Sequence, residues 1–235
     1  IDLNKLHINN DLDSRMKLAL NSLYPRGPDQ SGTYTDDYAY IVHARLSIID
    51  VSDNGKQPIC KYGKVLAFNG EIYNYIEVKN KLQKLGYKFY SHSDTEVLIA
   101  AWDQWEEESL THINGMFAFV IWDEAKKKLV LVRDPYGKKP LLYSINNNKI
   151  IFGSDLKSIE SILGYGDINP LAVESLFKLR FIHDPLTIYK EVNKLNPGSL
   201  INITNKGSEL KRWYGLNKKQ YENSNYDRET ALDNV

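Results

Sequence analysis

The chain has 235 residues, of which 42% are hydrophobic and 26% are charged, and this size fits one large or two small globular domains. The composition excludes disordered and fibrous proteins. Thirty basic and thirty acidic side chains give a formal net charge of zero, so no general attraction to nucleic acid or to an anionic membrane is expected. No run approaches the roughly 20 apolar residues that span a bilayer, and we expect a soluble protein.

The cysteine and histidine content limits the chemistry of the chain. Its single cysteine, Cys60, excludes a disulfide framework and a cysteine-based metal cluster within this sequence and is compatible with a reducing cytoplasm. The five histidines show no metal-ligand spacing, so a metal site is not expected. The sequence opens at Ile1 with neither an initiator Met nor a leader, which predicts an internal piece whose true start lies upstream.

Hydrophobic periodicity predicts a mixture of helices and hairpins. Helices are expected where apolar residues recur about every 3.6 positions, at 12–23, 73–85, 93–105, 155–163 and 170–179. Strands are expected at short apolar runs between turn residues, at 38–46, 64–68, 116–122, 129–133, 141–145, 149–152 and 199–203. Adjacent hairpins in this mixed order favour an α+β fold with two antiparallel sheets covered by helices over a doubly wound parallel sheet.

Local signals predict where these elements begin and end. Asp11 is expected to cap the first helix, and Ser93 followed by Glu96 has the spacing of a capping box. The stretch 26–32 is rich in turn residues and is expected to be a loop. Asn69-Gly70 is expected to end the strand that precedes it.

Polar residues that follow strand ends or start a helix are candidates for a site. The Asn69 side-chain amide and the Gly70 backbone N–H have the chemistry of an oxyanion hole, whereas the dipeptide alone favours a hairpin turn. Arg45 can hold a substrate carboxylate in a bidentate contact, although a lone arginine at a strand end favours a surface ion pair. Asp94 can receive a substrate ammonium group, but the helix dipole also favours an acidic residue in a first turn.

Six ordered motifs give a more specific signal than any of these clusters alone. They lie at 26–29, 44–50, 68–74, 93–96, 115–119 and 133–141, with Gln57-Pro58 between the second and the third. In this order they resemble the N-terminal glutaminase domain, a class II glutamine amidotransferase, of glutamine-hydrolysing asparagine synthetases, from residue 1 to about residue 214. The variant Asn-Gly-Glu-Ile-Tyr-Asn at 69–74 is typical of asparagine-synthetase-like members.

The resemblance implies an N-terminal-nucleophile hydrolase fold, a four-layer sandwich of two stacked antiparallel sheets between helical layers. In this family an N-terminal cysteine attacks the glutamine side-chain amide, and its own α-amino group, with an unperturbed pKa near 8, acts as the base. Carried over by motif, Arg45 would hold the glutamine α-carboxylate, and Glu71 and Asp94 would receive its α-ammonium group. Asn69 with Gly70 would stabilise the tetrahedral oxyanion.

The sequence departs from the family at its start. Ile1 aligns several residues after the family's N-terminal Cys-Gly-Ile, so the nucleophile is absent and the chain itself is expected to be inactive. Cys60 cannot replace it, because Cys60 is neither N-terminal nor part of a motif. Pro25 stands where the family often has a histidine, so a role of that histidine is not carried over to this position.

The resemblance also implies a division into domains. Residues 1–214 are expected to form the glutaminase domain, and residues 215–235 a linker with the start of a C-terminal ATP-dependent synthetase domain. The stretch 217–226 is polar with little to bury, and 227–235 could open a helix of that next domain. No cofactor is expected in the glutaminase domain, whereas ATP and Mg are expected in the synthetase domain.

The leading hypothesis is the glutaminase domain of an asparagine synthetase, which hydrolyses glutamine and supplies ammonia to ATP-activated aspartate in the synthetase domain. One alternative is an asparagine-synthetase-like amidotransferase that acts on another acceptor, and a second is a non-catalytic glutamine-binding or oligomerisation module. Glutamine and the synthetase domain of the same chain are the expected partners, and a homodimer is compatible with the sequence. Neither nucleic acid nor a membrane is expected as a partner, and the expected location is the cytoplasm.

Overall fold

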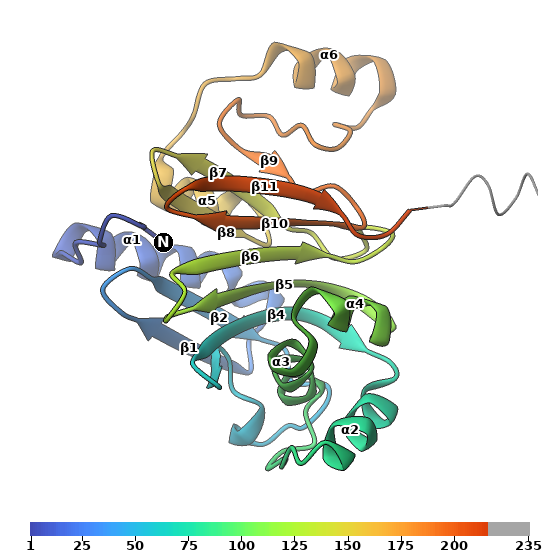
Figure 1. Cartoon of the computed structure of the whole chain (residues 1–235). Coiled ribbons are helices and arrows are strands. Elements are labelled where there is room, and N and C mark those ends of the chain that lie inside the picture. Colours follow the sequence, from blue (N-terminus) through green and yellow to red (C-terminus); the bar gives the residue numbers. More distant parts are fainter. Residues whose placement is uncertain (216–235) are drawn as a thin grey trace, which may run out of the picture.

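Two layers of β-strands lie face to face at the centre of the computed structural model, which describes residues 1–215 (Figure 1). The strands are β1 (Gln30–Thr35), β2 (Tyr40–Arg45), β3 (Ile59–Lys61), β4 (Lys64–Ile72), β5 (Gly115–Asp123), β6 (Lys128–Arg133), β7 (Leu142–Asn146), β8 (Lys149–Gly153), β9 (Asn193–Lys194), β10 (Ser199–Thr204) and β11 (Gly207–Arg212). The helices are α1 (Asn10–Leu23), α2 (Tyr75–Lys84), α3 (Asp94–Trp105), α4 (Ser109–His112), α5 (Leu156–Leu163) and α6 (Pro170–Leu179).

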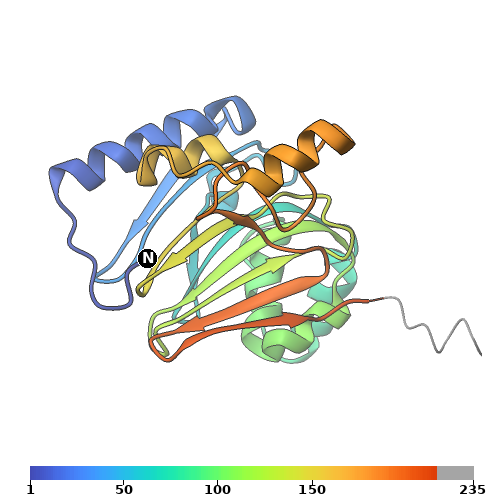
Figure 2. The ribbon, with the colours of Figure 1, turned by 90° about the horizontal axis from the view of Figure 1, so that it is seen from above.

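The two strand layers differ in their continuity. One layer is a six-stranded antiparallel sheet in the order β11-β10-β6-β5-β4-β3, and the other contains two separate antiparallel sheets, β1-β2 and β8-β7-β9. In Figure 2 the blue and gold helices α1, α5 and α6 lie on one side of the strands, and the teal and green helices α2, α3 and α4 on the other. The predicted α+β architecture of antiparallel sheets between helical layers is confirmed, although the second layer is divided.

Alternation along β4 divides the hydrophobic core into two parts. Leu66 faces the helices and packs in one cluster with Leu98 of α3. Val65 faces the other way and packs in a second cluster with Ile41 of β2 and Ile150 of β8. Because successive side chains of a strand point to opposite faces, both faces of the six-stranded sheet are buried.

The first helix and first strand begin at residues that differ from the prediction. Asn9, not Asp11, caps α1, because its side chain accepts a hydrogen bond from the Leu12 N–H at 2.8 Å. The loop predicted at 26–32 is shorter, since residues from Gln30 onward form β1 in antiparallel register with β2. The local turn signal is overridden here by the strand partner, which supplies the backbone hydrogen bonds.

The strand predicted at 64–68 is longer than expected. β4 continues through Asn69 and Gly70 to Ile72, and β5 pairs with it over this whole length. The hairpin-turn interpretation of Asn69-Gly70 is therefore wrong. The strands β1, β3, β9 and β11 have no counterpart among the predicted strands, because they are very short or lack an alternating apolar pattern.

The capping box predicted at the start of α3 is half present. Ser93 is the N-cap, and its hydroxyl accepts a hydrogen bond from the Thr95 N–H at 3.1 Å. Glu96 does not reach back to Ser93. Its buried carboxylate instead accepts hydrogen bonds from the backbone N–H groups of Tyr90 and Ser91, at 3.0 and 2.7 Å, and so fixes the loop before the helix.

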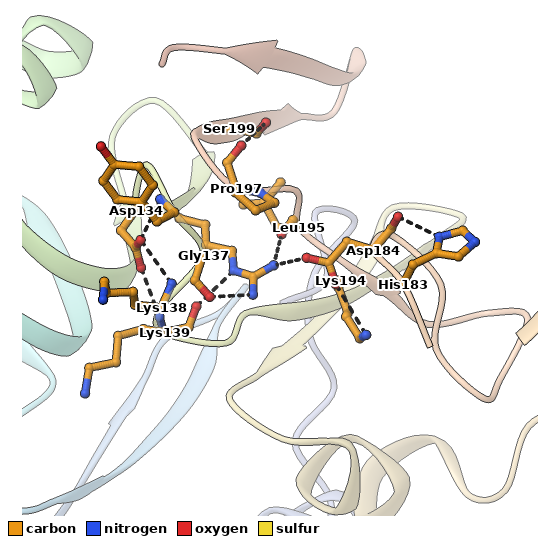
Figure 3. A network of polar contacts seen from close by, with 12 residues as sticks. Asp134, Gly137, Lys138, Lys139, His183, Asp184, Lys194, Leu195, Pro197 and Ser199 are labelled. Carbon is orange, nitrogen blue, oxygen red and sulfur yellow. Dashed lines mark hydrogen bonds and ion pairs between the residues drawn. The ribbon is translucent and has the colours of Figure 1, made fainter. Parts of the chain in front are cut away.

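A buried arginine joins β6 to the loop before β10. The Arg133 guanidinium donates hydrogen bonds to the carbonyl oxygens of Gly137, Lys139 and Leu195 at 2.9, 2.9 and 2.6 Å. It also forms an ion pair with Asp184 at 2.8 Å (Figure 3). This one side chain therefore holds together three segments that are distant in the sequence.

The neighbouring Asp134 shapes the loop that follows β6. Its carboxylate is fully buried and accepts hydrogen bonds from the backbone N–H groups of Tyr136, Lys138 and Lys139 at 3.0, 3.0 and 2.9 Å (Figure 3). These bonds fix the backbone of the loop around one side chain. The motif at 133–141 is thus explained by loop geometry.

The described part of the chain, residues 1–215, contains no helix with both the length and the hydropathy needed to cross a bilayer. The linker predicted at 217–226 and the helix predicted at 227–235 lie outside the described residues.

His43 makes a hydrogen bond between the two strand layers. Its Nε2 lies 3.1 Å from the Phe68 carbonyl oxygen, and because a carbonyl can only accept, Nε2 carries the proton. The other ring nitrogen, Nδ1, is buried and has no hydrogen-bond partner within residues 1–215. Burial is the main cause that lowers the pKa of His43 from 6.5 to about 4, and the positive charge of Arg45 adds to it. The imidazole is therefore neutral near pH 7.

The neutral state of His43 predicts an acid-dependent loss of stability. The unfolded chain protonates this histidine near pH 6.5 and the folded chain only near 4. The free energy of unfolding should therefore fall by up to about 1.4 kcal/mol per pH unit between these values. His43→Gln removes the titrating group and keeps an N–H for Phe68. Urea unfolding at pH 7, 6 and 5 should show a smaller loss in His43→Gln than in the wild type, and equal losses would contradict this assignment.

Candidate active site

The free edge of β4 carries one unpaired backbone N–H. Past its pairing with β3, β4 has a strand partner on one edge only. On the other edge the Phe68 N–H donates to Gln57 Oε1 at 2.7 Å, and the Ile72 N–H donates to Asp94 Oδ2 at 3.0 Å. Gly70 lies midway between them, and by the alternation of an antiparallel strand its N–H points to the same edge. This N–H has no partner within residues 1–215 and is available to a ligand oxygen.

Only glycine fits at this position of β4. Gly70 has φ +153°, and a Cβ added to it would lie 2.1 Å from the Met116 carbonyl oxygen of β5. A larger residue would push β4 away from β5, because backbone atoms cannot yield as a flexible side chain does. The close approach of the two strands therefore fixes the direction of the Gly70 N–H.

The side chains on either side of Gly70 face the second strand layer. Asn69 and Glu71 share the face of β4 that carries Val65, which packs against the strands of that layer. Neither side chain has a hydrogen-bond or ion-pair partner within residues 1–215. Within residues 1–215 the Asn69 amide is therefore available to a ligand in the cavity that Gly70 also lines.

Arg45 is a buried cation at the end of β2, with only 6% of its surface exposed. Its terminal nitrogens donate to Gln30 Oε1 at 2.7 Å and to the carbonyl oxygens of Ile49 and Asp50 at 2.9 and 2.5 Å. No acidic side chain of residues 1–215 forms an ion pair with it, so the surface ion-pair interpretation is wrong. A ligand carboxylate would reach Nε or replace one of the loop carbonyls, and it would supply the missing negative charge.

Asp94 is a buried anion at the first position of α3, with 4% of its surface exposed. Burial is the main cause that raises the pKa of Asp94, and the negative charge of the nearby Glu71 raises it further. Its hydrogen bond with the Ile72 N–H ties α3 to the end of β4, so it is more than an exposed first-turn acid. A cation placed between the two carboxylates would be favoured by both charges.

All five predicted site residues line one cavity of about 980 Å³. Arg45 enters the wall from β2, Asn69, Gly70 and Glu71 from β4, and Asp94 from α3. The cavity thus combines one buried cation, two carboxylates and two free N–H donors. This set of groups matches an amino acid with a side-chain carbonyl, because such a ligand presents a carboxylate, an ammonium group and a polarisable oxygen.

The same cavity extends between the two sheets of the second layer. Residues 40–45 of β2 and 149–153 of β8 form its sides, and residues of α1 and α5 cover it. The edges of β2 and β8 that face each other have no strand partner over most of this length among residues 1–215. The cavity therefore lies between two strand edges that are open within the described residues.

The first two residues of the chain enter one end of this space. The Ile1 amino group donates to the Ile150 carbonyl oxygen at 2.8 Å, and Asp2 forms an antiparallel bridge with Lys149 of β8. On the other side the Asp2 N–H donates to the Tyr38 carbonyl oxygen at 2.8 Å. Residues 1 and 2 are therefore bonded on both sides, to β8 and to the residues that precede β2.

The sequence alone predicted no role for two residues of the site, Gln57 and His43. Gln57 is buried, fixes the Phe68 N–H and also contacts the Thr95 hydroxyl at 3.5 Å. His43 fixes the Phe68 carbonyl oxygen and lines the cavity. The two side chains hold both polar groups of the residue just before Asn69. The sequence indicates a role for Gln57 only through the Gln57-Pro58 pair among the ordered motifs.

Cys60 lies outside the cavity wall. It is an exposed residue of β3, consistent with the interpretation that it cannot serve as the nucleophile. Within residues 1–215, no three histidine, cysteine, aspartate or glutamate side chains gather in a geometry that could hold a metal ion.

Comparisons with known proteins agree with this geometry. The family model described as glutamine amidotransferase domain matches residues 4–214. Asparagine synthetase [glutamine-hydrolyzing] 1 of Bacillus subtilis (strain 168) is 37% identical over 212 residues, which cover 89% of this chain and 33% of that protein. Asparagine synthetase [glutamine-hydrolyzing] 3 of the same organism is 30% identical over 87% of this chain and 34% of its own length. The chain thus spans about a third of the length of these curated relatives.

A solved structure shares the fold. Glutamine phosphoribosylpyrophosphate amidotransferase from B. subtilis, complexed with ADP and GMP, superposes with a TM-score of 0.61 at 20% identity over 85% of this chain and 46% of that chain. At this identity the similarity concerns the fold alone. The family match over nearly all described residues, together with the arrangement of the cavity, shows that the chain belongs to the glutamine amidotransferase domain family.

Proposed function

We propose that the chain is the glutaminase domain of a glutamine-hydrolysing asparagine synthetase and that its cavity binds glutamine. The observation that carries this proposal is a set of groups without partners in the described part of the chain. They are the Gly70 N–H, the Asn69 amide and the Arg45 guanidinium, which has no anionic partner there. Two donors fixed on a strand can stabilise the oxyanion that forms when an amide carbon is attacked. The asparagine synthetases among the relatives support this member of the family.

The charges of the cavity support glutamine in one orientation. In our proposal the α-carboxylate lies beside Arg45 and the α-ammonium group between Glu71 and Asp94. The side-chain carbonyl oxygen then receives hydrogen bonds from Asn69 and Gly70. Buried charges are stable only when they are paired, and each of these protein charges gains its opposite from the ligand.

We further propose that residues upstream of Ile1 in the whole protein form a strand between β2 and β8. This is supported by the two free strand edges and by the backbone bonds of residues 1 and 2 at one end of the cavity. The length of β2 corresponds to about six residues, or roughly 20 Å at the rise of an antiparallel strand. A cysteine at the start of such a strand would lie near Arg45 and Asn69.

The proposed reaction uses this cysteine as the nucleophile. Its sulfur adds to the glutamine side-chain carbon while its own α-amino group takes the thiol proton. Asn69 and Gly70 hold the oxyanion, and ammonia leaves with the proton returned by the amino group. Water then cleaves the thioester and releases glutamate. In the proposed synthetase domain, with ATP and Mg, the ammonia would convert aspartate to asparagine with release of AMP and diphosphate, and we place this reaction in the cytoplasm.

A glutamine-binding module without catalysis is the second candidate, and it would use the same charges. Such a module would not require N–H donors at the amide end of the ligand. The availability of Asn69 and Gly70 as donors therefore favours the enzyme. An amidotransferase with another acceptor shares the whole cavity with the leading proposal, and only the acceptor used by the full-length protein separates the two. The identity of the residue after the initiator Met is the direct test of catalysis, because the proposed mechanism requires cysteine there.

The first prediction from this proposed mechanism concerns a chain that begins at Ile1. A purified chain that begins at Ile1 should release no measurable glutamate from glutamine, because the oxyanion donors alone give only a residual rate. Full-length protein assayed in parallel serves as the control and should release glutamate. Robust glutamate release by the chain that begins at Ile1 would disprove the proposed nucleophile.

The second prediction concerns the oxyanion donors in the full-length protein. Asn69→Ala should slow glutamine-dependent synthesis by about 10²–10³-fold, or roughly 2.7–4 kcal/mol, the typical effect of one oxyanion donor. Synthesis from free ammonia should be preserved, because ammonia bypasses the cavity. The measurement compares both rates in wild type and variant. A parallel loss of the two activities would show that Asn69 is needed for the structure instead.

The third prediction concerns the two charged ends of glutamine. Arg45→Ala should weaken glutamine saturation by tens to thousands of fold, because one partner of a desolvated pair typically contributes about 2–5 kcal/mol. Arg45→Lys keeps the charge and should have a smaller effect. Asp94→Asn keeps the acceptor for the Ile72 N–H, removes the charge and should weaken saturation at the ammonium end.

Saturation curves for glutamine and for ammonium on each variant provide the measurement, and the ammonium curve is the internal control. Ammonium saturation should be unchanged in all three variants. Unaltered glutamine saturation in Arg45→Ala would remove Arg45 from the proposed binding site.

A further inference from the structure

Helix α6 has an apolar surface that the described residues leave uncovered. Its only polar residues are Glu174, Ser175 and Lys178, and Glu174 and Lys178 form an ion pair at 2.5 Å. Ala172 and Ser175 face the body of the domain and are buried. In both ribbon views α6 lies at the periphery, away from the six-stranded sheet (Figures 1 and 2).

The uncovered side chains are large. We call them the α6 patch: Leu171, Leu176, Phe177, Leu179 and Phe181, which are 62%, 43%, 83%, 53% and 57% exposed. A helix that is apolar on nearly all sides is normally buried in its protein. Scattered exposed apolar residues need no explanation, but a group of five on one helix and its end marks a contact surface.

The segment that carries the α6 patch is fixed rather than loosely attached. Ser175 Oγ donates to the Phe181 carbonyl oxygen at 2.9 Å, which holds the chain as it leaves the helix. Three residues later Asp184 forms its ion pair with Arg133 (Figure 3). Lys194 donates to the Ile182 carbonyl oxygen at 2.5 Å. The chain that leaves α6 is therefore bonded to the body of the domain.

The same arginine supports the point where the described chain ends. The Trp213 indole N–H donates to the Arg133 carbonyl oxygen at 3.3 Å, and the Trp213 backbone N–H donates to the Gly198 carbonyl oxygen at 2.9 Å. The end of the described chain is thus anchored to the residue whose side chain holds the segment after α6. Tethering of this kind gives a neighbouring domain an effective concentration in the mM range, which a separate copy of the chain does not reach.

We infer that the α6 patch is the surface on which the C-terminal domain of the same chain docks. The inference rests on the proposed function, which supplies that domain, and on the curated relatives, of whose length this chain spans about a third. The occupant presents a complementary apolar surface to Phe177 and Leu171. Glu174 and Lys178 lie at the polar rim of the contact, since rims of such interfaces are polar and solvent-accessible.

Hydroxyl-radical footprinting of the full-length wild-type protein tests the inference without a variant. Phe177 and Tyr90 are 83% and 77% exposed here, and Tyr90 lies outside the α6 segment, so Tyr90 is the internal control. With rates normalised to intrinsic reactivity, Phe177 should be labelled at least about tenfold more slowly than Tyr90. Similar labelling of the two residues would overturn the inference.

The identity of the occupant is tested by dilution and by cross-linking. Protection of Phe177 should be unchanged when the protein is diluted to a monomer, and Lys178 should cross-link to residues beyond 235 of its own chain. Phe177→Glu should abolish these cross-links, whereas Tyr90→Glu should preserve them. Protection that disappears on dilution would identify a second copy as the occupant and refute docking within the chain. None of these readouts depends on catalysis, so they are independent of the activity tests of Asn69 and Arg45.

Discussion

The close approach of β4 to β5 at Gly70 is the constraint on which the site depends. Because Gly70 has no Cβ, β4 can stay paired with β5 at this position. Since β3 has already ended there, the other edge of β4 is open. On that edge the backbone N–H groups of Phe68 and Ile72 are satisfied by side chains, whereas the N–H of Gly70 has no partner among residues 1–215. A backbone polar group without a partner is costly unless water or a ligand reaches it. The strand pairing therefore creates the donor that the proposed chemistry needs.

Charge compensation organises the rest of the cavity. The described residues bury the guanidinium of Arg45 without an anion and bury Asp94 beside Glu71 without a cation. Each arrangement is unfavourable alone in a poorly solvated site, and a zwitterionic ligand relieves both. The hydrogen bonds of Arg45 to the loop after β2 have a second consequence. They fix that loop to the cavity wall, so binding at Arg45 and loop geometry are coupled.

Three features of the domain have the same physical cause. Each presents groups that the described residues do not satisfy. The edges of β2 and β8 present backbone groups without a strand partner. The cavity presents charges without counter-charges, and the α6 patch presents apolar surface without a cover. Open backbone edges are satisfied by an added strand, and buried charges are satisfied by a zwitterionic ligand. Exposed apolar surface is buried by contact with another folded domain. The three proposals follow from the three kinds of unsatisfied group.

The sequence by itself determined the fold class and most helices and hairpins, and it named the five residues that the structure brings into one cavity. It did so because apolar periodicity is local and because the motifs occur in a fixed order. It misjudged Asn69-Gly70 as a turn and Arg45 as a surface ion pair when each was considered alone. Tertiary structure decided these points, since β5 supplies the pairing that keeps β4 extended and the loop after β2 buries the guanidinium. The roles of Gln57 and His43 were likewise decided only by contacts with Phe68, because partners distant in the sequence leave no local pattern.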